Sequence, residues 1–201
     1  MLTLDHLAVT AASLDDAIAH IEAALGVAMT GGGKHPQFAT HNRLLGAGDI
    51  YLEAIATDPA APKPQYPRWF DLDNFTGPPA LNFWVARCEN LNATLIRLPG
   101  YAPPLPLSRG DYRWRMATGP DGSTPMDGSF PALIQWQGTL HPTATLPETQ
   151  IRLTRLEIAH PDAATLRCAL NLTDPRIQIT QGPHKALRAT FTTPHGLRTL
   201  C

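Results

Sequence analysis

The sequence predicts an α+β fold made of a repeated strand–helix–strand unit. Three apolar, strand-like stretches are each followed by a helix-like stretch: residues 2–9, 80–86 and 153–159. The first two copies continue into further predicted strands, whereas the third copy is shorter. We therefore expect two βαβββ modules and a partial βαββ module packed on the same domain: residues 1–76, 77–147 and 148–201.

The opening strand has an alternating pattern with one histidine near its middle. Successive side chains of a strand point to opposite faces. Alternation therefore places Leu4, His6 and Ala8 on one face and Asp5 on the other. The side chains of His6 and Asp5 are therefore expected on opposite faces of the sheet.

The rest of the first module has clear start and stop signals. Ser13 is a typical helix N-cap, and Gly26 is a typical stop after the helical stripe of residues 14–25. Strands at 38–45 and 50–56 are separated by a short glycine-containing turn, which predicts a hairpin. The glycines that precede this hairpin are interpreted as a flexible turn.

The second and third modules are separated by proline-rich connections. Residues 59–79 contain Trp69 and Phe70 among prolines, and we interpret them as an ordered crossover whose aromatic side chains cover the site. The proline-rich stretch 99–106 is also interpreted as a connection. The remaining strands are predicted at the following positions: 112–118, 132–137, 176–180 and 186–192.

Composition excludes several classes of protein. The chain has 201 residues, of which 43% are hydrophobic and 16% charged, as in a globular protein. A net charge of −1 gives no basic surface for nucleic acid, and no apolar run is long enough to span a membrane. Three widely spaced cysteines argue against a disulfide framework and predict a cytoplasmic protein.

Six short segments carry a family resemblance: Leu-Asp-His-Leu at 4–7, Gly-Gly-Lys-His-Pro at 32–36, Thr-His-Asn at 40–42, Tyr-Leu-Glu at 51–53, Arg-Trp-Arg at 113–115 and Pro-Ala-Leu-Ile-Gln-Trp at 131–136. With the repeated modules, they make the chain resemble the vicinal oxygen chelate superfamily, which includes glyoxalase I, the extradiol dioxygenases and the bleomycin-resistance proteins. Within it, the chain is most similar to the glyoxalase-like domain family. The motifs are specific for the fold and much less specific for the reaction.

The resemblance implies that the paired modules form an open, cup-shaped sheet around one site. Members of the superfamily hold a metal there on four side chains, one from the first and one from the last strand of each module. The matching positions in this chain are the following four: His6, Glu53, Asn82 and Gln135. The implied cofactor is one divalent ion, Zn²⁺, Mn²⁺, Fe²⁺ or Ni²⁺, held by His6 and Glu53.

Two interpretations of this set stay open. Glu53 lies in an otherwise uncharged strand, where a carboxylate needs a metal, a hydrogen-bonded partner or water. Asn82 and Gln135 offer only neutral amide oxygens, which are weak ligands for these metals. The alternative is a hydrogen-bonded polar network, in which His6 and Glu53 could still move protons without a metal.

Further residues are expected to line the site. A His-Asn pair in a strand puts one side chain on each face, and we place His41 in the cup. Arg113 and Arg115 share a face and could hold an acidic group, since Trp114 on the other face resembles core packing. Trp84 shares the face of Asn82 and is expected to form a wall.

Two functions follow from these residues. The first is an enzyme of the glyoxalase type, an isomerase, lyase or dioxygenase. It would act on a small oxygenated metabolite, including acidic ones, with His6 and Glu53 as catalytic residues. The second is a non-catalytic protein that sequesters a small molecule, as in the bleomycin-resistance branch. The third module is expected to cover a sheet or to form a homodimer.

Overall fold

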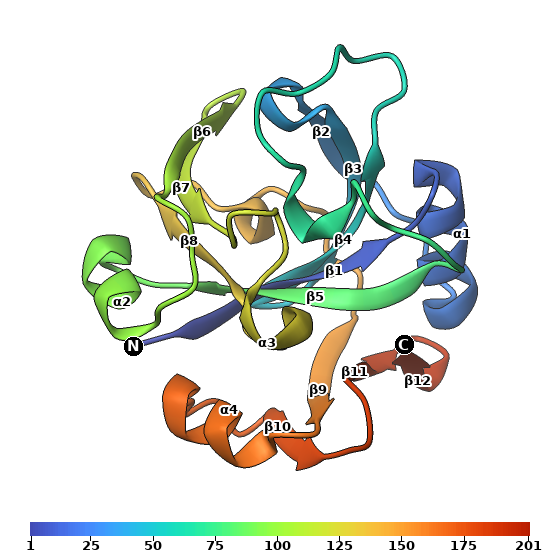
Figure 1. The fold of residues 1–201 in the computed structure, drawn as a ribbon. Coiled ribbons are helices and arrows are strands. Elements are labelled where there is room, and N and C mark those ends of the chain that lie inside the picture. The colour runs from blue at the N-terminus through green and yellow to red at the C-terminus, as the bar shows by residue number, and fades with distance from the viewer.

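The computed structural model describes residues 1–201 and contains two β-sheets with four short α-helices (Figure 1). The strands of the larger sheet are β1 Thr3–Thr10, β2 Gly31–His35, β3 Thr40–Ala47, β4 Ile50–Thr57, β5 Ala80–Arg87, β6 Leu105–Arg109, β7 Tyr112–Ala117 and β8 Ala132–Trp136. Those of the smaller sheet are β9 Arg152–His160, β10 Ile177–Gln181, β11 Ala186–Thr193 and β12 Gly196–Leu200. The helices are α1 Leu14–Leu25, α2 Leu91–Arg97, α3 Pro125–Gly128 and α4 Ala163–Leu170.

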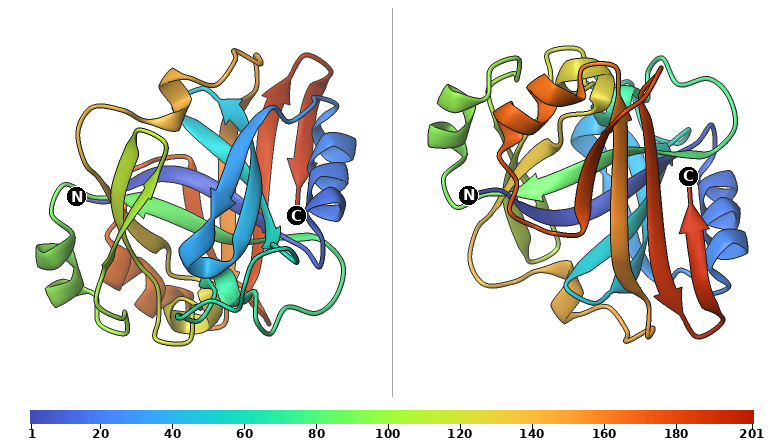
Figure 2. Two further views of the ribbon diagram at one scale, coloured as in Figure 1. Left: turned by 90° about the horizontal axis from the view of Figure 1, so that it is seen from above. Right: turned by 90° about the horizontal axis from the view of Figure 1, so that it is seen from below.

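The larger sheet is a pair of similar halves joined at its centre. Its strand order is β2-β3-β4-β1-β5-β8-β7-β6. In each half the first strand pairs in parallel with the last, β1 with β4 and β5 with β8, and β1 pairs antiparallel with β5 between the halves. The sheet curls round so that β2 and β6 approach one another (Figures 1 and 2). The predicted α+β class and cup-shaped sheet are therefore confirmed.

Apolar side chains fill both faces of this sheet. The outer face forms the larger core with α1, α2 and the smaller sheet, and the concave face carries a second, more aromatic cluster. Helix α1 begins with Ser13 accepting a hydrogen bond from the amide of Asp16 and ends at Gly26 in the left-handed region, as predicted. None of the helices is long and apolar enough to cross a membrane.

The C-terminal sheet lies across the outer face of the larger sheet (Figure 2). It has one strand more than predicted, β12, and its order is β10-β9-β11-β12. Its first strand therefore lies inside the sheet, between a parallel and an antiparallel neighbour. Residues such as Leu156 and Phe191 share the larger core with Leu7 of β1. The C-terminal unit thus covers the apolar back of the cup but does not repeat its topology.

The two edge strands of the cup were not predicted. β2 consists largely of glycine, and β6 lies within the stretch interpreted as a proline-rich connection. Glycine and proline weaken a strand signal, yet both are tolerated at sheet edges, where half of the backbone groups need no ladder partner. These edges matter for the site because β2 ends at His35 and β6 ends at Arg109.

A bulge in β1 changes which side chains share a face. The pairing with β5 passes from Leu4 opposite Ala86 directly to His6 opposite Val85, so Asp5 is an extra residue. Leu4 consequently packs in the outer core, although alternation had placed it beside His6. The extra residue shifts the alternation by one position, and both Asp5 and His6 are directed towards the concave side.

Candidate functional site

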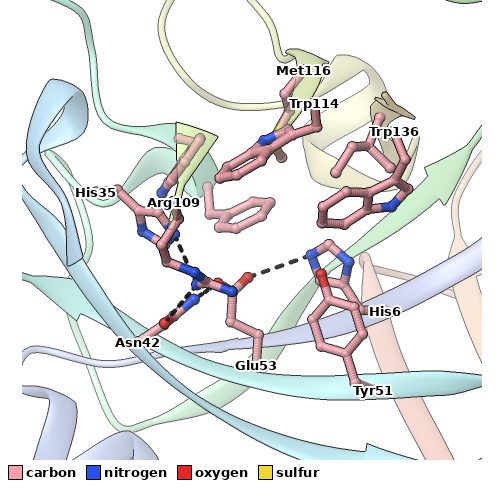
Figure 3. A pocket seen from close by; sticks show the side chains of 12 residues that line it. His6, His35, Asn42, Tyr51, Glu53, Arg109, Trp114, Met116 and Trp136 are labelled. Carbon is pink, nitrogen blue, oxygen red and sulfur yellow. Dashed lines mark hydrogen bonds and ion pairs between the residues drawn. The ribbon is translucent and has the colours of Figure 1, made fainter. Parts of the chain in front are cut away.

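The concave face of the cup contains a narrow pocket (Figure 3). Its cavity volume is about 30 Å³. Polar groups line one side and aromatic or aliphatic groups the other. The lining residues are His6, His35, Asn42, Tyr51, Glu53, Trp69, Phe70, Arg109, Trp114, Met116, Ile134 and Trp136.

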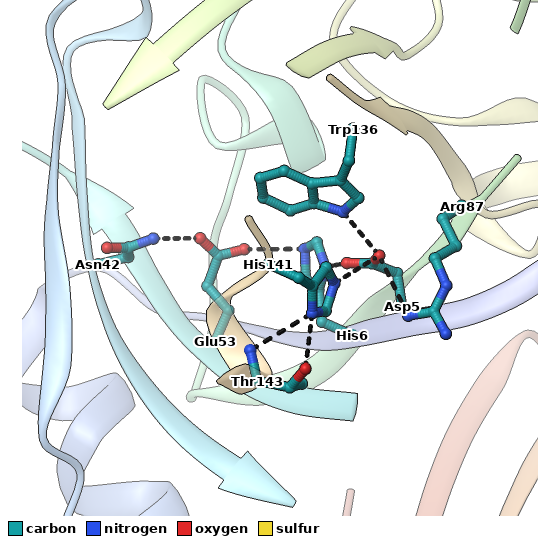
Figure 4. Close-up of polar contacts among 8 residues, drawn as sticks. All are labelled: Asp5, His6, Asn42, Glu53, Arg87, Trp136, His141 and Thr143. Atoms are coloured by element: carbon teal, nitrogen blue, oxygen red, sulfur yellow. Dashed lines mark hydrogen bonds and ion pairs between the residues drawn. The ribbon is translucent and has the colours of Figure 1, made fainter. Parts of the chain in front are cut away.

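The centre of the site is a buried chain of two carboxylates joined by an imidazole (Figure 4). His6 Nδ1 lies 2.7 Å from Asp5 Oδ1, and His6 Nε2 lies 3.4 Å from Glu53 Oε2. The ring of His6 stacks on Tyr51 with 4.4 Å between the ring centroids. The ring is therefore fixed both in its plane and along its hydrogen-bonding axis.

Asp5 is fully buried and has several cationic or N–H partners. Trp136 Nε1 donates to its Oδ2 at 2.9 Å, His141 Nε2 lies 3.1 Å from the same oxygen, and an Arg87 guanidinium nitrogen lies at 3.8 Å. Burial raises the pKa of the Asp5 carboxyl, but hydrogen bonds from His141 and His6 outweigh it and hold the pKa well below its ordinary value. Asp5 is therefore an ionised anchor for His6.

Glu53 is oriented from its other side by an amide. Asn42 Nδ2 donates to Glu53 Oε1 at 2.5 Å. The Oδ1 atom of Asn42 accepts from the amide of Gly33 at 2.8 Å and from Arg109 at 3.1 Å, which settles the orientation of the amide. Burial raises the pKa of Glu53, but its hydrogen bond and charge interaction with His6 produce a net lowering. Glu53 therefore faces the pocket as a carboxylate.

His6 is positively charged near neutral pH. Burial alone lowers the pKa of its imidazole, but the hydrogen bonds to Asp5 and Glu53 outweigh this effect and raise the pKa to about 9. The second histidine of the pocket behaves in the opposite way, because burial lowers the pKa of His35 to about 4. An Arg109 guanidinium nitrogen lies 3.3 Å from His35 Nε2, as expected for a neutral imidazole that accepts there.

His6 and Glu53 are brought together as predicted, whereas Asn82 and Gln135 lie elsewhere. The pairing of β1 and β5 skips Asn82, whose side chain donates to Thr10 Oγ1 at 2.8 Å outside the pocket. Gln135 points to the outer face, where its Nε2 donates to the Glu89 carbonyl at 2.7 Å next to α2. The expectation for these two residues was therefore wrong.

His41 and Trp84 are also placed differently from the prediction. Asn42, not His41, points into the cup, and His41 lies on the opposite face near Ser13. Trp84 is fully buried in the outer core, where its indole donates to the Ser129 carbonyl at 2.9 Å. The bulge at Asn82 explains Trp84, because the residues after it do not share the face that simple alternation assigned to them.

The prediction for the two faces of β7 was wrong, because it placed the arginines on the concave face and Trp114 on the outer one. Trp114 and Met116 line the pocket, while Arg113 is exposed and Arg115 donates to Asn92 on α2 at 2.9 Å. The arginine of the site is Arg109, which sequence analysis missed because it follows the proline-rich stretch. An arginine at the end of β6, aligned with Tyr112 across the hairpin, was the available signal.

The residues present do not fit the four-ligand metal site that the resemblance implies. Only His6 and Glu53 of the implied set line the pocket, and each is hydrogen-bonded to a neighbour on its other side. No group of three or more His, Cys, Asp or Glu side chains in the chain is arranged to hold a metal ion. The side chains therefore form a hydrogen-bonded network of carboxylates, imidazole and amide rather than a four-ligand metal site.

Comparisons with known proteins agree with this architecture. Residues 4–172 match the family described as the glyoxalase-like domain. A hypothetical protein from Staphylococcus aureus has a similar structure, with a TM-score of 0.67, 12% identity and coverage of 92% of this chain and 88% of that one. Methylmalonyl-CoA epimerase from Mycobacterium tuberculosis has a TM-score of 0.44, 18% identity and coverage of 68% and 88%.

No curated protein matches the chain significantly. The family match nevertheless covers most of the sequence and includes both halves of the cup. The chain belongs to the glyoxalase-like domain family.

Proposed function

We propose that the chain is an enzyme that removes and returns a proton on carbon next to the carbonyl group of a small oxygenated acid. The observation that carries this proposal is the Asp5–His6–Glu53 chain, which ends in the pocket with an ionised carboxylate beside an imidazolium. Such a pair supplies a base and an acid at adjacent positions. In this proposal His6 and Glu53 are the catalytic residues.

Each group has a defined part in the proposed step. Glu53 takes the proton from carbon, and the electrons of the broken C–H bond form an enolate. The Nε2–H of His6 then donates to the enolate oxygen, and Asp5 holds the imidazole in the required orientation from Nδ1. Return of a proton from Glu53 to the same carbon restores the carbonyl group, and a solvent proton picked up by Glu53 in the meantime replaces the original hydrogen with no net oxidation.

The pocket also offers groups for the acidic end of a substrate. Arg109 is its one guanidinium, and it reaches the pocket from the β6 edge. The indole N–H groups of Trp69 and Trp114 are buried and have no acceptor within the protein. A substrate carboxylate would satisfy such donors, which otherwise cost free energy when they are shielded from water.

The experiment is deuterium exchange at carbon 3 of 2-oxobutanoate in D₂O, followed by proton NMR. We expect wild-type protein to catalyse exchange and Glu53→Gln to lower the rate by about 10² to 10⁴, the usual contribution of a general base. Exposed Glu148 provides a matched control, because Glu148→Gln removes a carboxylate far from the pocket. Equal rates in Glu53→Gln and wild type would contradict the proposal.

The same assay tests the metal interpretation. Protein treated with a chelator and protein supplied with Zn²⁺, Mn²⁺, Fe²⁺ or Ni²⁺ are expected to exchange at equal rates. Stoichiometric metal binding that is lost in His6→Ala and that accelerates exchange would show that His6 and Glu53 act as ligands instead.

A second candidate is a binder that sequesters its ligand without chemistry. The aromatic side of the pocket favours it, since Trp69, Trp114 and Trp136 all line the pocket. Saturable quenching of tryptophan fluorescence by 2-oxobutanoate, with no exchange above the buffer rate, would support this function over the first.

A further inference from the structure

A second pocket lies directly behind the aromatic wall of the first. It is bounded by Phe38 and Tyr66 on one side and by Leu105 on the other. Trp69 and Met116 belong to both pockets, so that each forms part of the wall between them. Figure 3 shows Met116 next to Trp114 in the first pocket. The cavity volume is about 240 Å³, compared with about 30 Å³ for the polar pocket.

The lining of the second pocket differs from that of the first in its chemistry. It contains no acidic, basic or histidine side chain and includes three prolines. A cavity with such walls gains free energy from apolar groups and offers few partners to a charged one. A small oxygenated head group is thus suited to the first pocket, and an alkyl or aryl group to the second.

Contacts between loops hold the second pocket open. The amide of Ala102 donates to the Thr118 carbonyl at 2.8 Å, which joins the segments on either side of the β6–β7 hairpin. Gly122 has φ +85°, and a Cβ atom there would lie only 1.9 Å from the Arg68 carbonyl oxygen. The loop of Gly122 and the crossover therefore touch backbone to backbone, an approach that only glycine permits.

The boundary between the pockets carries an unsatisfied donor. Trp69 is 3% exposed, and its indole N–H has no acceptor within the protein. The two residues after it, Phe70 and Asp71, have φ of 59° and 53°, in the left-handed region that non-glycine residues rarely adopt. Strained backbone of this kind clusters at ligand sites.

We propose that the second pocket binds the apolar tail of the substrate, whose carbonyl head lies at His6 and Glu53. The substrate class is an oxo acid with an alkyl or aryl substituent long enough to pass Trp69 and Met116. This inference rests on the proposed function for the identity of the head group. The tail site itself rests on the shared walls and the apolar lining.

The test is a series of straight-chain 2-oxo acids from pyruvate to 2-oxooctanoate. Dissociation constants are measured by quenching of tryptophan fluorescence, and exchange at carbon 3 is measured by NMR on the same samples. We expect binding to tighten by about fourfold for each methylene that enters the pocket, the factor for transfer of one CH₂ from water. The gain is expected to stop once the pocket is full.

A filling variant shows whether the second pocket causes this gain. Ala102 lines the second pocket and not the first, so a larger side chain at this position should fill the tail site alone. Ala102→Trp is expected to weaken binding of 2-oxooctanoate at least tenfold, to an affinity close to that for 2-oxobutanoate. The exchange rate of 2-oxobutanoate itself should not change. Ala102→Leu should give a smaller loss, which guards against misfolding of the larger variant. Ile96 is 85% exposed on α2, and Ile96→Trp is the matched control that should retain the full gain.

The outcomes separate the two proposals. A flat series, or no binding of any acid, would overturn the tail site even if Glu53 exchanges the short acid. A chain-length gain that survives Ala102→Trp would also overturn it. Chain-length-dependent binding that Ala102→Trp abolishes, with no exchange by wild type, would support the tail site and refute the proposed chemistry.

Discussion

The two halves of the cup share a topology but not a chemistry. In both halves the first and last strands pair in parallel across the floor. The β1–β4 half contributes the ionisable groups His6 and Glu53 to the concave face, together with Asn42. The corresponding strands of the other half contribute residues such as Val85 and Ile134. A duplicated fold therefore does not imply a duplicated ligand set.

Bulges account for part of this difference. In β1 the extra residue is Asp5, which joins His6 on the concave side and anchors it. In β5 the extra residue is Asn82, whose side chain is diverted to Thr10. One irregularity thus adds a polar side chain to the first half of the site, and the other removes one from the second half.

The largest effect should follow from breaking the anchor of the polar half. Asp5→Asn replaces a carboxylate that has only donor partners by an amide that directs an NH₂ group at one of them. We expect a loss of about 3–5 kcal/mol in the free energy of unfolding, as for other buried ion pairs that lose one partner. Urea denaturation measures it, with exposed Asp111→Asn as control. A loss below 1 kcal/mol would show that Asp5 is not a charged anchor.

The polar half should also make stability depend on pH in a defined direction. The pKa of His6 is raised from 6.5 to about 9, so its contribution is fully present below pH 6.5 and is lost as the pH rises through about 9. Lys185, whose pKa burial lowers to about 8, acts in the opposite direction at alkaline pH.

The contribution of His6 is therefore measured as the difference in stability between the wild type and a variant without this histidine. Melting temperatures of wild type and His6→Gln are compared from pH 6 to 9.5, and the stability advantage of the wild type is expected to shrink over this range. Parallel curves for the two proteins would mean that His6 is not charged in the folded state.

Two neighbouring tryptophans allow a comparison between an indole N–H that has a hydrogen-bond acceptor and one that has none. Trp136 donates to Asp5, whereas the indole of neighbouring Trp114 has no acceptor within the protein. Trp136→Phe should cost about 1.5–3 kcal/mol more than Trp114→Phe, the usual contribution of a hydrogen bond to a charged group. Thermal and urea unfolding measure both. Equal costs would remove the assigned role of the Trp136 indole.

The smallest effects are expected on the outer face. Arg115 contacts only Asn92 through its guanidinium, and Arg115→Ala should change the free energy of unfolding by less than about 1 kcal/mol. Exchange of 2-oxobutanoate should not change. Arg109→Ala, on the concave side, should instead weaken binding of the acid at least tenfold. Similar binding by both variants would show that Arg109 is not the acid-binding group.

Sequence reasoning found the elements with strong local signals. A few neighbouring residues are enough to recognise each of three features: the helix cap at Ser13, the helix end at Gly26 and the isolated carboxylate of Glu53. The need of Glu53 for a partner followed from the apolar strand around it, and His6 is that partner.

What could not be predicted depends on tertiary structure. A bulge shifts alternation by one position, and no local pattern marks it, so the faces of Leu4 and Trp84 were misassigned. The edge strands β2 and β6 contain glycine or proline, which an edge strand tolerates because it pairs with a neighbour on one side only. Because β6 was not predicted as a strand, Arg109 at its end was not recognised as a residue of the site. Three neighbours, Arg87, Trp136 and His141, reach Asp5 from distant parts of the chain, which no spacing in the sequence indicates.

The placement of His6 and Glu53, the two groups proposed to move protons, in one half of the cup has a stereochemical consequence. In the proposed reaction, a flat enolate held between the two halves would have His6 and Glu53 on one side and the side chains of Ile134 and Trp114 on the other. Deuterium from the solvent can then reach carbon 3 of 2-oxobutanoate from one side only. The enzyme would distinguish the two prochiral hydrogens of that carbon, and the first product would be a single monodeuterated enantiomer.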